Sequence, residues 1–557
     1  MSSKRKPVRV AILCRDYMFQ AWEAACLREV MTLSNVQIVL LIAEAPANSP
    51  ATGNKLVNYP YRNFYWRFYD RYRLDIPAYK LVSLKKEFEI VPVISCRPEL
   101  KGKYSQHLSS EDIEKIKSHQ PDVILRFAFN ILRGEILTVA KYGVWSFHHA
   151  DEQIIRGGPA AFWEIYNRVP VTGAILQRLT EKLDAGIILR KGHFPTIFHS
   201  YKENLEQLIN GTASWMKQAL IDVANEQSPA VTGNAIETKA PVYTFPRNFT
   251  MARFRNRLLF NKLRFHFREL FKPEQWNIGI LDQGTADVLA NGISPTIEWL
   301  PEPKSNEYYA DPFGWKVKDE LKIVFEKYRY KNQKGILALS DTKGNMQTLL
   351  DAKVHLSYPF VLERSDGEKA NRVILPESHA AGNLFCFDSA NPKNGKVIIE
   401  NLPAVDATPV QYKDRWWIFC TKPGPLSNTE LFIYHADQFE GPWLPHENNP
   451  VKSDVRSSRP GGTPFILNGK LYRPAQDCSV SYGGAIVINE IITLTENSFA
   501  EKTIRRIEPQ KSWKFNKGLH TFSIAGNNIL IDAKRYAFNF DNFGHILTRK
   551  IKRIFSK

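Results

Sequence analysis

The chain has 557 residues, a formal net charge of +18 and 43% hydrophobic residues. A chain of this length exceeds a single hydrophobic core, so we expect at least two domains. The composition excludes a disordered protein. The six cysteines are scattered with no CxxC pair, which argues against a disulfide framework and a zinc site. No apolar run approaches the ~20 residues of a membrane span. We therefore expect a cytoplasmic protein without a bound metal.

Short apolar runs alternate with helical spacing in the first 240 residues. Strands are expected at Val8–Cys14, Val36–Ala43, Glu89–Ser95, Val123–Phe127, Val144–Phe147 and Thr172–Leu179, and a helix at Gln20–Thr32. This alternation predicts an α/β domain with a doubly wound parallel sheet, which binds ligands at the carboxyl ends of its strands. No GxGxxG follows the first strand, so a dinucleotide cofactor is not expected.

The segment 59–74, YPYRNFYWRFYDRYRL, is rich in aromatic residues and arginine. It is either an amphipathic insertion that packs its rings on the domain or a surface for glycans or lipid headgroups. In the second case rings stack on sugars and guanidinium groups bind phosphate.

Candidate catalytic residues follow two of the expected strands. The strand ending at Phe147 delivers His148 to the carboxyl edge of the sheet, and a later turn, LDAG, carries Asp184. Such a pair can act as a general base and its orienting carboxylate. A lone histidine at a strand end can equally be structural.

The order of these motifs resembles the folate-dependent formyltransferases that act on methionyl-tRNA, glycinamide ribonucleotide and sugar nucleotides. The matching positions are His148, Arg156-Gly157, Pro159, Thr172-Gly173 and Leu183-Asp184-Ala185-Gly186. The resemblance implies formyl transfer from 10-formyltetrahydrofolate to an amine, with His148 donating to the oxyanion and Asp184 orienting it. It places Arg156 and Gly157 on the substrate side. The implied folate pocket consists of Arg126, Phe127, Ala128, Phe129, Asn130 and Leu132.

The chain departs from this family at one catalytic position. The asparagine that donates to the oxyanion in the family falls on Ser146. Loss of an oxyanion donor typically lowers the rate by ~10²–10³. Either Ser146, His149 or a water completes the site, or the domain keeps the fold without the activity.

After about residue 275 short strands and turns form a weak repeat. Its copies contain Pro312, Pro359, Pro409 and Pro464, and a weaker copy lies near Phe522. A spacing near 50 residues with about four strands per copy is typical of propeller blades, so we expect a five-bladed β-propeller. The strand Trp276–Asp282 would close its ring. A long irregular β-sandwich is the alternative.

The runs YADPF and DATP resemble family-43 glycosidases and the propeller module of plant glucosamine inositolphosphorylceramide transferases. Asp311, Glu377 and Asp406 are the candidate substrate-binding residues of this half. Carboxylates around a funnel can act as acid and base in glycoside cleavage. Acids in tight turns also accept backbone hydrogen bonds. We expect carbohydrate binding here.

A basic connector, residues 241–275, joins the formyltransferase-like domain (1–240) to the expected propeller (276–540), and a basic tail follows (541–557). On a helical projection Arg253, Arg257 and Arg264 share one face, while Leu259 and Leu263 share another. The helix either packs on the propeller with a solvated basic face or lies on an anionic bilayer as a peripheral contact.

Three hypotheses follow. The first is an N-formyltransferase for an amino sugar or glycolipid, with a glycan-binding propeller. The second places catalysis in the propeller, as a glycosidase or glycan-transfer enzyme, and the third is a non-catalytic glycan scaffold. Known nucleic-acid-binding motifs are missing, so we expect no nucleic-acid partner.

Overall fold

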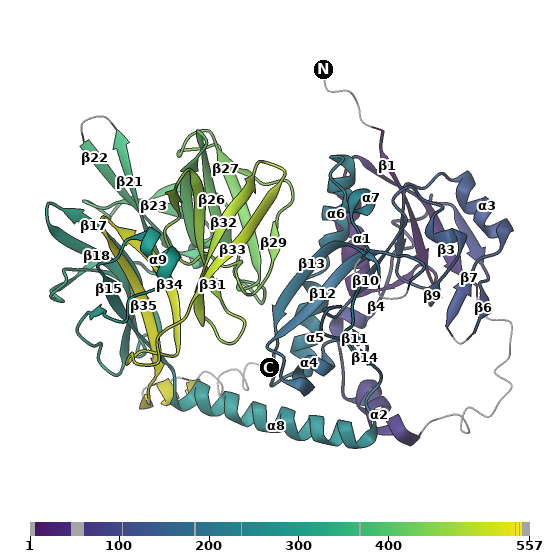
Figure 1. The fold of residues 1–557 in the computed structure, drawn as a ribbon, viewed down its shortest axis with the longest axis horizontal. Helices are drawn as coiled ribbons and strands as arrows, with labels where there is room; N and C mark the ends of the chain where they lie inside the picture. Colours follow the sequence, from purple (N-terminus) through teal and green to yellow (C-terminus); the bar gives the residue numbers. More distant parts are fainter. Residues whose placement is uncertain are drawn as a thin grey trace. The chain divides into compact units, whose positions relative to one another are not determined.

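The computed structural model describes residues 6–45, 61–102, 104–182, 185–235, 237–366, 369–540, 542–544 and 546–548. It consists of two compact units, Met1–Asn261 and Lys262–Lys557. Their boundary lies within helix α8 (Asn248–Phe271), which falls inside the expected basic connector (Figure 1).

The first unit is built around a seven-stranded sheet in the order β13-β12-β10-β8-β1-β3-β5. Its strands are β1 (Val8–Cys14), β3 (Val36–Glu44), β5 (Val93–Cys96), β8 (Val123–Arg126), β10 (Val144–His148), β12 (Val171–Arg178) and β13 (Ile187–Pro195). These bounds confirm the predicted strands to within one or two residues at most ends. The strand predicted from Glu89 is the exception, since β5 begins only at Val93.

The expectation of a parallel sheet is wrong for one strand, β12. β1, β3, β5, β8 and β10 are parallel, but β12 runs antiparallel to both β10 and β13. Only residues 179–186 connect β12 to β13. A parallel connection needs a dozen or more residues for its crossover, so this short link forces a hairpin.

Helices cover both faces of the parallel strands. As a result, every residue from Val10 to Leu13 is fully buried. Ala11 and Leu13 pack in one core cluster with Ile113 and Ile116 of α3, while α6 contacts β1, β13 and α1. The helices are α1 (Ala21–Met31), α2 (Phe64–Tyr72), α3 (Ser110–Ser118), α4 (Phe162–Asn167), α5 (Tyr201–Asn210), α6 (Trp215–Ala224) and α7 (Pro229–Thr232). None of the helices in the described residues is long and apolar enough to span a membrane.

The second unit contains a succession of small antiparallel sheets. The first sheet joins strands from both ends of the unit: β15 (Glu274–Leu281), β16 (Glu298–Trp299), β34 (Gly518–Ala525) and β35 (Asn528–Tyr536). The second sheet comprises β17 (Glu307–Val317), β18 (Glu320–Arg329), β19 (Lys334–Ser340) and β20 (Met346–Leu350), and the third comprises β21 (Ser357–Asp366), β22 (Lys369–Glu377), β23 (Leu384–Asp388) and β24 (Lys396–Ile399). The fourth sheet comprises β25 (Val405–Tyr412), β26 (Arg415–Thr421), β27 (Glu430–Ala436), β28 (Leu444–Pro445) and β29 (Lys452–Ser453), and the fifth comprises β30 (Phe465–Leu467), β31 (Lys470–Asp477), β32 (Ala485–Leu494) and β33 (Phe499–Ile507). β15 pairs with β35, so the strand expected to join the two ends of this unit does so.

The first strands of several sheets share a bulge. The register shifts between Ala310 and Phe313 in β17, and equivalent shifts occur in β21, β25 and β34. A bulge bends the strand and redirects a side chain. The residues at these equivalent positions are Asp311, Tyr358, Asp406 and His520. The repeat therefore follows the bulges and not the prolines, because Pro409 lies beyond the bulge of β25, in regular pairing with Ile418.

Candidate functional site

In the first unit, Arg126 and Ser146 meet at the ends of two neighbouring strands. β8 and β10 are parallel with Leu125 beside Trp145, and the Arg126 Nη1 atom donates to Ser146 Oγ at 2.8 Å. Arg126 Nη2 also donates to the carbonyl oxygens of Phe129 and Asn130, at 2.7 and 2.8 Å. The Arg126 guanidinium therefore contacts both Ser146 and the loop that follows β8.

Ser146 and Arg126 each keep a hydrogen-bond donor that is weakly engaged or has no partner among the described residues. Ser146 Oγ accepts from Arg126. Its own proton is donated to the Phe147 carbonyl over a long distance of 3.3 Å. Arg126 Nε is buried without a hydrogen-bond partner among the described residues. Burial lowers the pKa of Arg126, but an arginine remains charged at neutral pH.

The two adjacent histidines differ in environment. His148 is half-buried at the end of β10. His149 is also half-buried; its Nε2 atom lies 3.3 Å from Thr212 Oγ1 and its ring contacts Trp22. Burial and the nearby His148 lower the pKa of His149 to about 3, so it remains neutral. Leu183 and Asp184 lie outside the described residues.

The residues expected to hold folate form the loop that follows β8. The amides of Phe127 and Ala128 both donate to the Leu13 carbonyl, at 2.9 and 3.2 Å. Phe129 has a positive φ of 66°, and Leu132 lies in β9 (Ile131–Leu132) beside β7 (Ser105–His107). The loop is thus fixed at the carboxyl end of the sheet.

Arg156 and Gly157 lie against another strand. They form β11 (Arg156–Gly157), which pairs with β14 (Val242–Tyr243). Arg156 Nε donates to the Ala240 carbonyl at 2.7 Å. A Cβ at Gly157 would lie 2.1 Å from the Tyr243 carbonyl oxygen, so this close approach requires glycine. The contacts of these two residues are those of a structural strand pair.

Buried charges that the sequence did not single out lie elsewhere in the first unit. Lys191 Nζ contacts Asp151 and Glu152 at 2.8 and 2.9 Å. Glu164 in α4 is 2% exposed, and apart from its own backbone amide its carboxylate oxygens lack a hydrogen-bond partner among the described residues. Burial raises the pKa of Glu164 to about 7, and the Asp151 charge adds to this effect.

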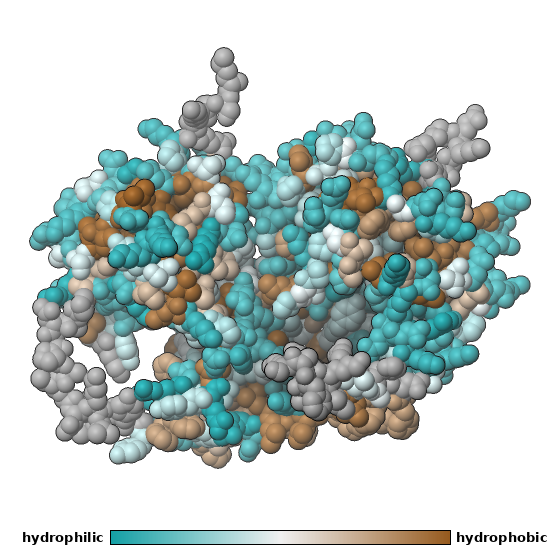
Figure 2. All heavy atoms as spheres, turned by 180° about the vertical axis from the view of Figure 1, so that it is seen from behind, coloured by the Kyte–Doolittle hydropathy of each residue, from teal (hydrophilic) through white to brown (hydrophobic). Residues whose placement is uncertain are grey.

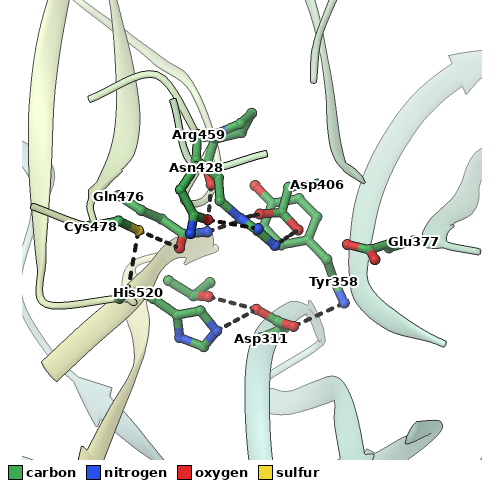
Figure 3. Close-up of polar contacts among 12 residues, drawn as sticks. Asp311, Tyr358, Glu377, Asp406, Asn428, Arg459, Gln476, Cys478 and His520 are labelled. Carbon is green, nitrogen blue, oxygen red and sulfur yellow. Dashed lines mark hydrogen bonds and ion pairs between the residues drawn. The ribbon is translucent and has the colours of Figure 1, made fainter. Parts of the chain in front are cut away.

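In the second unit, the bulged strands bring their side chains together in one buried cluster (Figure 3). His520 Nε2 lies 3.2 Å from Asp311 Oδ1, and its Nδ1 atom lies 2.8 Å from Asp532 Oδ1. Burial alone would lower the pKa of His520, but the two carboxylates raise it to about 10. Asp311 Oδ2 also accepts from the Tyr358 amide at 3.1 Å.

Asp406 and Glu377 form the other part of this cluster (Figure 3). Arg459 Nε donates to Asp406 Oδ2 at 2.6 Å, and Gln476 Nε2 donates to the same oxygen at 2.9 Å. Burial raises the pKa of Asp406 to about 8, with Glu377 and Asp311 adding and Arg459 opposing. Burial would also raise the pKa of Glu377, but the hydrogen bond with His379 and the charge of Arg459 lower it. The pKa values of these two neighbouring carboxyl groups are therefore shifted in opposite directions.

The possible ligand atoms of Asp311, His520 and Asp532 lie within 4.8 Å of one another, close enough to surround a metal ion. Asp532 already accepts the amides of Asp311 and Thr521, at 2.8 and 2.9 Å. The hydrogen bonds and ion pairs of these three residues account for their positions in the cluster.

The structure unites the three acids predicted for this half and adds Tyr358, Arg459, Gln476 and His520 to them. Glu377 does not start a sheet: it ends β22, next to Asp406. Arg459 was missed because it lies in a loop outside the strand pattern. A serine- and glycine-rich run, RSSRPGG, was the available signal.

Comparison with known proteins gives separate matches for the two halves. The family model for the N-terminal region of glucosamine inositolphosphorylceramide transferase 1 matches residues 269–528. The protein of that name from Oryza sativa subsp. japonica is 32% identical over 211 residues, which is 35% of this chain and 28% of that protein. Methionyl-tRNA formyltransferase of Bacillus subtilis (strain 168) is 36% identical over 83 residues, which is 15% of this chain and 26% of that protein. The chain thus spans little more than a quarter of the length of these relatives.

Among solved structures, a sugar N-formyltransferase from Shewanella sp FDAARGOS_354 is 14% identical, with a TM-score of 0.28, covering 42% of this chain and 76% of that chain. A thermostable family-43 glycoside hydrolase is 12% identical, with a TM-score of 0.29, covering 39% and 79% respectively.

Proposed function

We propose that the first unit transfers a formyl group from 10-formyltetrahydrofolate to the amine of an amino sugar or glycolipid. The observation that carries the proposal is the hydrogen bond from Arg126 to Ser146, two residues before His148. The amine attacks the formyl carbon and creates an oxyanion, which Ser146 stabilises by turning its hydroxyl proton from the Phe147 carbonyl to the oxyanion. Similarity to methionyl-tRNA formyltransferases over 83 residues supports this reaction.

Arg126 compensates for the missing asparagine. Hydrogen bonding to a cation makes the Ser146 hydroxyl a stronger donor, and charge-assisted hydrogen bonds are roughly twice as strong as neutral ones. His148 takes the proton from the attacking amine and passes it to N10 of the folate, so that the bond between N10 and the formyl carbon breaks and tetrahydrofolate leaves. Asp184, by its resemblance to the family's aspartate, orients His148.

The second unit supplies glycan binding in this proposal. We propose that its sheets, each of about four strands, form the blades of a five-bladed propeller whose centre is the cluster of Asp311, Glu377 and Asp406. The match of residues 269–528 to the plant transferase family supports a glycolipid-related role. One carboxylate oxygen of Asp406 accepts hydrogen bonds from both Arg459 and Gln476. This engagement favours carbohydrate binding over glycoside cleavage, because a catalytic acid must be free to protonate the leaving group.

The test combines ligand binding and turnover. A folate analogue, 5-formyltetrahydrofolate, is expected to raise the melting temperature of the full chain, since a ligand at 100 times its Kd stabilises by about 2.7 kcal/mol. Tetrahydrofolate release is then measured with a panel of amino-sugar nucleotides and glycolipids. His148→Gln is expected to lower the rate by ~10²–10⁴, and His119→Gln, outside the site, should leave it unchanged. Absence of both the thermal shift and turnover would refute formyl transfer.

A further inference from the structure

Helix α8 exposes its apolar side chains instead of burying them. Only Met251 and Phe254 are fully buried on this helix. The apolar stripe comprises Phe249, Leu259, Phe260, Leu263 and Phe267, whose exposed fractions are 80, 60, 62, 62 and 48%. At 3.6 residues per turn these side chains fall within an arc of about 100° that lies opposite the two buried residues. Figure 2 shows hydrophobic residues along the lower margin of the view, where α8 runs.

Basic residues flank the apolar stripe on both sides. On the same projection Arg253 and Arg264 follow one edge of the stripe, and Arg255 and Lys262 follow the other. Glu269 is the single acid of the helix. An apolar stripe between two cationic edges is the pattern of a helix that lies in the plane of an anionic bilayer.

A basic recess adjoins one edge of the helix. It has a volume of about 320 Å³ and is lined by Arg168, Arg253 and Arg257 together with Tyr166 and Asn167. The guanidinium of Arg257 lies 4.9 Å from the centre of the Tyr166 ring. None of the three arginines forms an ion pair with a carboxylate of the described residues. Several arginines converging on one space favour a phosphate group.

Helix α2 adds a second exposed aromatic face next to the start of α8. Phe64, Phe68 and Tyr72 are 64, 42 and 65% exposed, whereas Trp66 is buried against Phe162. Tyr65 N donates to Asn248 Oδ1 at 2.9 Å, which joins the two helices. The described part of the aromatic segment 59–74 therefore both packs on the unit and presents rings to solvent.

We propose that α8 docks this protein on an anionic phospholipid bilayer, with the apolar stripe inserted between headgroups and a lipid phosphate in the basic recess. A flat anionic surface meets both cationic edges at once, which explains why basic residues line the two sides equally. The proposal goes beyond formyl transfer and does not depend on it, because its test measures no catalysis.

The experiment sediments the full chain with vesicles of phosphatidylcholine, alone or mixed equally with phosphatidylglycerol. We expect binding to the anionic vesicles that falls with added salt. The double variant Leu259→Gln, Leu263→Gln should lose affinity on the order of tenfold. Its matched control is Leu444→Gln, Ile466→Gln, whose side chains are similarly exposed, at 55 and 56%, in the second unit.

A second pair of variants tests the charges. The substitutions Arg253→Gln and Arg257→Gln should each weaken vesicle binding roughly fivefold. The control variant Lys343→Gln, Lys353→Gln should have little effect. Equal binding to neutral and anionic vesicles, or unchanged binding of the leucine variant, would overturn the proposal. So would a dimer in the absence of lipid that the leucine variant dissociates, since the apolar stripe would then cover a second copy of the chain.

Discussion

His520 lies between two buried carboxylates, at 3.2 Å from Asp311 and 2.8 Å from Asp532, and this environment couples the stability of the second unit to alkaline pH. Its pKa rises from 6.5 to about 10 on folding. Each pKa unit corresponds to about 1.4 kcal/mol, so the shift corresponds to at most about 5 kcal/mol. This stability is fully present below pH 6.5 and is lost as the pH rises through about 10. Since the cluster relaxes when it loses a proton, we expect a loss of about 3–5 kcal/mol.

The pKa is measured directly on full-length protein labelled with ¹³C at histidine Cε1. The resonance that is missing in His520→Gln should titrate near pH 10, and urea denaturation should show the free energy of unfolding falling between pH 7 and 10. The Trp276 ring, 4.0 Å from the His520 ring, provides a local fluorescence signal. His520→Gln should be less stable at pH 7 and nearly insensitive to pH in this range. Titration of His520 near pH 6.5, or stability that is equal at both pH values, would refute the argument.

Two further variants test buried positions. Burial raises the pKa of Glu164 from 4.5 to about 7, so its charge destabilises the first unit by up to about 3 kcal/mol as the pH rises through this range. Glu164→Gln should therefore raise the free energy of unfolding at pH 8 but not at pH 4, as measured by denaturation. At Gly462, with φ +135°, an added Cβ would lie 1.8 Å from the Phe522 carbonyl oxygen. Gly462→Ala should therefore cost roughly 2–4 kcal/mol, while Gly469→Ala, which also has a positive φ but no atom within 4 Å, should cost only about 1–2 kcal/mol.

The strands of the first unit could be predicted because buried parallel strands are continuous apolar runs with little ambiguity. The direction of β12 could not, since an apolar run has the same appearance in either direction. In the second unit, β15, which begins at Glu274 and pairs with β35, was predictable from its apolar pattern. The bulges were not, because skipping two residues in a ladder leaves no distinct local signal, and the prolines suggested a register that fails at Pro409.

Both candidate sites depend on contacts that strand order creates and spacing does not reveal. Arg126 and Ser146 were each singled out in the sequence, yet in different roles, because their pairing requires β8 and β10 to be parallel neighbours with Leu125 beside Trp145. Arg459 lies 53 residues from Asp406 and enters the cluster from the loop between β29 and β30. In each case an arginine binds the residue that the sequence identified as chemically active. A long, charged side chain can reach across neighbouring strands. The effect of a changed motif residue, such as Ser146, therefore depends on the side chains beside it in the sheet as well as on its own hydrogen-bond donor.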